Sequence, residues 1–197
     1  MKKPHLYLDC DEVLLKTAGT HALFLEQQYD ISVDQSLYPS QWSFPPNSGL
    51  DFKKSTENFI KSDYFANIPA MPNAVEAVKL LCEHDYTMSI VSSISSDSIA
   101  QQKRISNLYA VFGNSFYEIQ LLPLGWANKI AFYQSKPHGI VIDDSIFNIQ
   151  DAIKCGHEAV FIRIPQNKSH HELAKQQCIT SNSSLFDWVK NQTIKQR

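Results

Sequence analysis

The stretch Leu6-Tyr-Leu-Asp9-Cys-Asp11-Glu-Val13 determines how the rest of this chain can be interpreted. Its beginning, His5–Leu8, has the length and composition of a short buried strand. Asp9 and Asp11 follow directly, and side chains two residues apart on an extended chain point to the same side. Two carboxylates held together repel each other unless a cation or a proton lies between them. The stretch therefore predicts a strand that ends at a metal site or an acid–base pair; solvated acids at a strand end are the simpler alternative.

Beyond this strand, short β-prone runs alternate with helical patterns. Further strands are expected over Thr87–Val91, Tyr117–Leu122, Gly139–Ile142 and Ala159–Ile162, and helices over Pro72–His84, Asp97–Val111, Ala127–Tyr133 and Ile146–Lys154. A strand followed by repeated helix–strand units predicts an α/β fold, with a three-layer, Rossmann-like core built on a parallel sheet. The polar run Thr180–Ser184 is interpreted as a linker before a last helix.

Residues 16–67 interrupt the alternation, because they contain no clear strand. We interpret them as a small helical cap inserted after the first strand, which leaves residues 1–15 and 68–197 for the α/β core. Eight aromatic residues fall in or near the middle of the insertion: Tyr29, Tyr38, Trp42, Phe44, Phe52, Phe59, Tyr64 and Phe65. Most are expected to form the core of the cap, while Trp42 or Phe44 is the candidate for facing a cleft and stacking on a flat substrate.

Polar residues follow other predicted strands as well. Asp143-Asp144 comes directly after Gly139–Ile142, Ser92-Ser93 follows Thr87–Val91, and Lys129 precedes the Gly139 strand. Ligands of α/β sheets bind outside the carboxyl ends of the strands. Paired acids there need a counter-charge, and Mg²⁺ is the natural candidate because it prefers carboxylate oxygens, water and substrate phosphate. Each feature alone is more often a solvated surface group or a helix cap.

Taken in order, these residues resemble the four motifs of the haloacid dehalogenase-like superfamily of aspartate-nucleophile hydrolases. The matching stretches are Leu6–Val13, Ser89–Ser92, Lys129 and Ile140–Asn148. The resemblance implies a Mg²⁺-dependent phosphatase that hydrolyses a small phosphomonoester through an aspartyl-phosphate intermediate. The presence of Asp11 favours phosphate chemistry over the dehalogenase branch of the superfamily.

The resemblance also implies a role for each residue. Asp9 would be the nucleophile, and Asp11 the general acid and then the general base. Mg²⁺ would bind the Asp9 and Asp144 carboxylates and the Asp11 backbone carbonyl, with Asp143 reaching it through water or supporting its ligands. The residues expected to hold the phosphate oxygens are Ser92, the Ser93 amide and Lys129.

Two further stretches, Asp9–Leu14 and Asp63–Val75, are similar to the 5'(3')-deoxyribonucleotidase-like group. The substrate expected from this similarity is a nucleoside or deoxynucleoside monophosphate, with Trp42 and Phe44 as candidate base-binding residues. The alternatives are a sugar phosphate, a nucleic-acid phosphate end, or a catalytically idle module that binds a phosphorylated ligand or a protein.

Composition excludes several other classes of protein. The chain has 197 residues, 43% hydrophobic and 19% charged, with a formal net charge of −2, so bulk binding to nucleic acid or to an anionic membrane is not expected. The cysteines Cys10, Cys82, Cys155 and Cys178 form no metal-binding cluster or disulfide framework. With no signal peptide or transmembrane stretch recognised, we expect a cytoplasmic monomer or homodimer.

Overall fold

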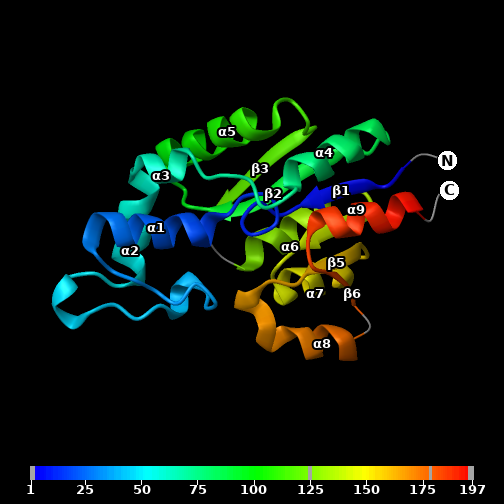
Figure 1. The fold of residues 1–197 in the computed structure, drawn as a ribbon. Coiled ribbons are helices and arrows are strands. Elements are labelled where there is room, and N and C mark those ends of the chain that lie inside the picture. Colours follow the sequence, from blue (N-terminus) through cyan, green and yellow to red (C-terminus); the bar gives the residue numbers. More distant parts are fainter. Residues whose placement is uncertain (1–2, 124–125, 178, 195–197) are drawn as a thin grey trace.

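Six parallel strands form the centre of the protein, in the order β3-β2-β1-β4-β5-β6 (Figure 1). The computed structural model describes residues 3–123, 126–177 and 179–194. The strands are β1 (His5–Leu8), β2 (Met88–Ile94), β3 (Glu118–Pro123), β4 (Gly139–Asp143), β5 (Glu158–Ile162) and β6 (Thr180–Asn182). The predicted α/β fold with a parallel, Rossmann-like sheet is therefore confirmed.

Helices cover both faces of this sheet (Figure 1). They are α4 (Ala74–Glu83), α5 (Ser98–Phe112) and α9 (Leu185–Ile194) on one face, and α6 (Trp126–Ser135), α7 (Ile146–Lys154) and α8 (His171–Gln176) on the other. The alternation of side chains along β1 explains the two layers. Leu6 and Leu8 belong to the larger apolar core with residues of α4 and α5, whereas Tyr7 packs with Phe132 and Ala152 of α6 and α7.

The insertion between β1 and α4 is helical, and we call residues 16–67 the inserted segment. It contains α1 (Thr17–Tyr29), η1 (Pro39–Gln41), η2 (Pro46–Ser48), α2 (Phe52–Lys61) and α3 (Asp63–Ala66). The chain that enters the segment and the chain that leaves it are hydrogen-bonded to each other. The Lys16 amide donates to the Pro69 carbonyl at 2.9 Å, and the Met71 amide donates to the Leu14 carbonyl at 2.8 Å. The segment is thus joined to the sheet by two connecting stretches of chain that run side by side.

Two of the predicted elements differ from the structure by more than two residues. The second strand runs three residues further than expected, to Ile94, which places Ser92 and Ser93 inside it. The linker prediction is wrong for Thr180–Asn182, which forms β6 and pairs with Val160–Ile162 of β5. A polar strand of three residues has no alternating apolar pattern, so only its pairing with β5 defines it.

Two sequence expectations concern the chain as a whole. Among the described residues, Cys10 is a buried free thiol, Cys82 an exposed one and Cys155 a half-buried one, while Cys178 lies outside that part of the chain. The described helices include none that is both long and apolar enough to cross a membrane.

Candidate active site

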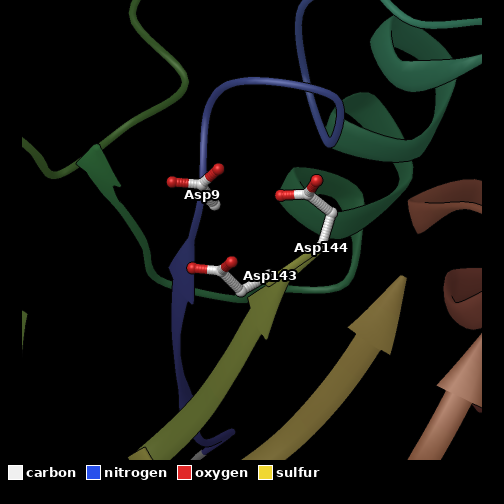
Figure 2. A group of neighbouring side chains, drawn as sticks. All are labelled: Asp9, Asp143 and Asp144. Atoms are coloured by element: carbon white, nitrogen blue, oxygen red, sulfur yellow. The ribbon is translucent and has the colours of Figure 1, made fainter. Parts of the chain in front are cut away.

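Three buried aspartates meet at the carboxyl ends of β1 and β4 (Figure 2). Leu8 pairs with Ile142, and the Asp9 amide continues this ladder by donating to the Ile142 carbonyl at 2.9 Å. The register therefore places Asp9 next to Asp143, and Asp144 follows in the chain. One carboxylate oxygen from each of the three lies within 4.8 Å of the others. Two strands thus bring together acids that are 134 residues apart (143 − 9).

Lys129 of α6 lies between two of these acids. Its Nζ donates to Asp9 Oδ1 at 2.7 Å and to Asp143 Oδ2 at 2.8 Å, and the whole side chain is buried. Burial by itself lowers the pKa of Lys129, but Asp143 and Asp9 together raise it well above its ordinary value. Lys129 is therefore a cation, and it fixes Asp9 Oδ1.

Asp143 is the most fully bonded of the three acids. Besides Lys129, it accepts hydrogen bonds from the Ser145 amide at 2.8 Å and from Asn148 Nδ2, which reaches both carboxylate oxygens at 3.0 and 3.1 Å. Its side chain is 1% exposed. Hydrogen bonds occupy both of its carboxylate oxygens, so Asp143 positions the side chains of Lys129 and Asn148.

The protein alone does not compensate the negative charge that the other two acids, Asp9 and Asp144, carry when they ionise. Burial, with smaller contributions from Asp143 and Asp11, raises the pKa of Asp9 to about 7 despite the opposing effect of Lys129. Burial, followed by Asp143 and Asp9, raises the pKa of Asp144 well above its ordinary value. If all three carboxylates are ionised, they and the one lysine carry an excess of two negative charges in a buried space (−3 + 1 = −2), which a bound cation would neutralise. This donor set fits a hard divalent cation such as Mg²⁺.

Glu12 stabilises the turn that follows Asp9. It has a positive φ of 59°, and its carboxylate accepts a hydrogen bond from the Ala18 amide at 2.7 Å in the first turn of α1. Burial raises the pKa of Glu12 to about 7. Glu12 therefore links the loop that carries the aspartates to the start of the inserted segment.

Asp11 faces the inserted segment. Its Oδ1 accepts a hydrogen bond from Arg104 Nη1 of α5 at 2.7 Å and another from the hydroxyl of Thr17. The Asp11 side chain is 36% exposed, whereas that of Arg104 is 1% exposed. Asp11 is thus the acid of this site that a molecule entering from the inserted segment would meet.

A cavity of about 230 Å³ begins at Asp11 and extends between the inserted segment and the sheet. The core contributes Asp11, Ser93 and Arg104 to its wall. The aromatic side chains that line it are Tyr38, Phe52, Phe59 and Phe65. Ser93 is half-buried there, and its neighbour Ser92 is buried in β2. The predicted phosphate-binding serines therefore lie on the strand next to β1, one of them at the cavity.

Trp42 and Phe44 lie elsewhere in the inserted segment. Trp42 is 6% exposed, its ring packs on His21 at 5.1 Å, and its Nε1 donates to the Asp34 carbonyl at 3.0 Å. Phe44 is half-buried against the same apolar core. Neither residue is in the cavity wall. A count of aromatic residues in the sequence does not show which of them face inward, because that depends on how α1 and α2 pack.

Arg104 and Thr17 are residues of this site that the sequence did not predict, although the chain contains a signal for Arg104. Ala100, Arg104 and Leu108 are spaced by four residues, and all are buried on one face of α5. A charged residue within the apolar stripe of a helix needs a buried partner. That periodicity indicates an ion pair, but it does not identify Asp11 as the partner.

No protein-family model matches the sequence, and no curated protein matches it. Several solved structures, however, are similar to this protein. A haloacid dehalogenase-like hydrolase from Streptococcus pneumoniae is 15% identical with a TM-score of 0.64, over 96% of this chain and 98% of that one.

Two further structures show the same likeness. D,D-heptose 1.7-bisphosphate phosphatase from B. bronchiseptica, complexed with magnesium and phosphate, is 15% identical over 100% of both chains with a TM-score of 0.60. CbbY from Rhodobacter sphaeroides, in complex with phosphate, is 15% identical over 93% of this chain and 95% of that one, with a TM-score of 0.60. The protein therefore has the α/β, Rossmann-like fold of the haloacid dehalogenase-like hydrolases.

Proposed function

We propose that the protein is a Mg²⁺-dependent phosphatase that hydrolyses a small phosphomonoester through an aspartyl-phosphate on Asp9. The observation that carries this proposal is the cluster of Asp9, Lys129, Asp143 and Asp144 at the carboxyl ends of β1 and β4. Within this fold, structures of a phosphatase with magnesium and phosphate and of CbbY with phosphate support the same chemistry.

The residues that would hold Mg²⁺ are the Asp9 and Asp144 carboxylates and the Asp11 backbone carbonyl. Asp143 would support them, because its oxygens are already bonded to Lys129, Asn148 and the Ser145 amide. When bound, the ion supplies the positive charge that lets a carboxylate approach a phosphate dianion.

The reaction proceeds in two steps, formation of the aspartyl-phosphate and its hydrolysis. First, an Asp9 oxygen attacks phosphorus, the bond from phosphorus to the ester oxygen breaks, and Asp11 gives its proton to the departing oxygen. Next, water attacks the phosphorus of the aspartyl-phosphate and gives a proton to Asp11, while the bond to Asp9 breaks. An alcohol and inorganic phosphate leave, and both aspartates return to their starting states. Lys129, Ser92 and the Ser93 amide hold the phosphate oxygens during both steps.

The cavity beyond Asp11 would receive the leaving group, because the general acid has to touch the departing oxygen. Its four aromatic side chains favour a flat leaving group, and a nucleoside or deoxynucleoside monophosphate is the substrate that we propose on this ground. A volume of about 230 Å³ is below the range of about 300–1,000 Å³ for drug-sized ligands, which favours a small molecule.

A sugar phosphate is the second candidate. The heptose bisphosphate phosphatase with the same fold favours it, as do serine hydroxyls such as that of Ser93, a residue of the cavity wall. Such hydroxyls can hydrogen-bond a sugar, which a purely apolar pocket could not. We propose that it acts in the cytoplasm, which the scattered cysteines favour, as a monomer or homodimer.

The test is release of phosphate from 5'- and 3'-nucleoside monophosphates and from sugar phosphates, with and without Mg²⁺. Asp9→Asn should abolish release, and the exposed Asp30→Asn, at a left-handed position that asparagine tolerates, should not. Preference for nucleotides supports the first substrate class, and preference for sugar phosphates supports the second. Turnover that persists in Asp9→Asn or in excess chelator would overturn the mechanism. A folded protein with no turnover would favour a binding module.

A further inference from the structure

Arg104 is a buried charge to which the reaction above assigns no role. It lies in the middle of α5 with a side chain that is 1% exposed, between Ala100 and Leu108 on the same buried face. Burying a guanidinium is costly unless its hydrogen bonds are satisfied. Arg104 Nε has no hydrogen-bond partner among the described residues, so solvation of the charge depends on what its other nitrogens contact.

Those contacts lead to the loop that carries the aspartates. Arg104 Nη1 donates to Asp11 Oδ1 at 2.7 Å and to Cys10 Sγ at 3.0 Å. The guanidinium carbon lies 4.9 Å from the centre of the Phe65 ring of α3. Cys10 and Phe65 are both buried, so Arg104 is held between the loop after β1 and the inserted segment.

The bonds to Asp11 are unevenly distributed. Arg104 and the Thr17 hydroxyl both donate to Oδ1, and the described contacts of the carboxylate include none to Oδ2. Asp11 nevertheless lines the cavity and is partly exposed there. Two donors from different elements, α5 and α1, thus hold one oxygen, and the second oxygen has no partner among the described contacts.

We propose that Arg104 is a positioning residue that, with Thr17, holds Asp11 Oδ1 so that Oδ2 meets the departing oxygen of the substrate. This inference rests on the proposed phosphatase function and adds a residue to it. Although Arg104 lines the cavity, its side chain is only 1% exposed, and the role proposed for it is to orient Asp11 rather than to bind the substrate. Its effect is on orientation, and misplacing a catalytic group by about 1 Å can cost roughly 100-fold in rate.

The experiment compares two substrates that differ in their need for an acid. An alkyl phosphate such as glycerol 2-phosphate needs a proton on its leaving oxygen, whereas p-nitrophenyl phosphate does not, because p-nitrophenolate leaves readily. We expect Arg104→Met to lower kcat for the alkyl phosphate about 10- to 100-fold, part of the roughly 100- to 10,000-fold that a general acid contributes. For p-nitrophenyl phosphate the loss should stay below about 3-fold.

Three further variants make the test specific. Arg104→Lys keeps the buried charge without the planar fork, and Thr17→Val removes the other donor; both should give smaller losses that are again confined to the alkyl phosphate. Lys103→Met is the matched control, because Lys103 also joins α5 to the inserted segment, through the Lys61 and Ser62 carbonyls, and does not contact Asp11. It should affect both substrates equally.

A double-variant cycle separates positioning from stability. In an Asp11→Asn background, Arg104→Met should cause no further selective loss, since the residue that it positions is already inactive. Equal losses on both substrates in every Arg104 and Thr17 variant, or full additivity with Asp11→Asn, would overturn the positioning role and leave the phosphatase intact. A wild-type protein that hydrolyses neither substrate would overturn the proposed function and this inference with it.

Discussion

Acid should reduce the contribution that one buried histidine of the inserted segment, His21, makes to the stability of this protein. The ring lies in α1 with 4% exposure, stacks on Phe59 at 4.4 Å and 7°, and shares a 2.6 Å hydrogen bond between its Nε2 and the buried hydroxyl of Ser55. Burial lowers the pKa of His21 from 6.5 to about 4, against a smaller opposing effect of Ser55. The folded protein therefore keeps His21 neutral where an unfolded chain would protonate it.

The size and sign of the effect follow from that difference in pKa. Below about pH 6.5 the unfolded chain binds a proton that the folded one refuses, so stability falls with pH until the folded pKa near 4 is passed. At about 1.36 kcal/mol for each pH unit, the full loss is roughly 3 kcal/mol, of which roughly 2 kcal/mol has appeared by about pH 5. A loss of this size is a large fraction of the stability of an ordinary domain.

Urea unfolding near pH 7 and near pH 5 measures this loss. The comparison protein is the double variant His21→Phe with Ser55→Ala, which keeps a ring on Phe59 and removes both hydrogen-bonding partners together. Asp9 and Glu12 have raised pKa values, which add stability as the pH falls, but they act equally in both proteins and cancel in the difference. The same pH dependence in wild type and double variant would refute the reasoning.

Three further outcomes are expected. Because the pKa of Asp9 is raised to about 7, the stability of the metal-free protein should fall as the pH rises through that value. Mg²⁺ binds the ionised carboxylate, so it should raise the melting temperature more above about pH 7 than below it. An equal rise in melting temperature on both sides of pH 7 would contradict the proposed metal site. Lys129→Met leaves buried carboxylates unpaired and should cost about 3–5 kcal/mol in urea unfolding, against less than about 0.5 kcal/mol for the exposed Lys79→Met. Phe52 lines the cavity, so Phe52→Ala should raise KM for nucleotides more than for glycerol 2-phosphate; an unchanged ratio of the two KM values would exclude stacking on Phe52. Trp42 is buried, so Trp42→Ala should instead destabilise the fold by about 3–5 kcal/mol.

The sheet and the aspartate cluster could be predicted because both depend on short local patterns. A run such as His5–Leu8 or Gly139–Ile142 is recognisable as a buried strand from its own composition, and parallel strands end at the same edge. Acids that follow two adjacent strands must then lie close together, as Asp9 and Asp143 do.

Pairings between distant elements could not be predicted in this way. Strand β6 has no apolar alternation and exists because β5 offers a free edge to Thr180–Asn182. Trp42 and Phe52 are aromatic residues of the same segment, yet one is buried in its core and the other lines the cavity. Their difference follows from the rotation of short helices against one another, which composition does not specify.

The sequence by itself determined the parallel α/β sheet, the helical insertion and the set of acids at the strand ends, since strand periodicity and chain order suffice for these. Only the tertiary structure decided which aromatic side chains line the cavity and that Arg104 holds Asp11. The physical reason is the separation of 93 positions between Asp11 and Arg104 (104 − 11): the two meet only after α5 has packed beside the inserted segment. Contacts of that range depend on the whole fold, and no local pattern contains them.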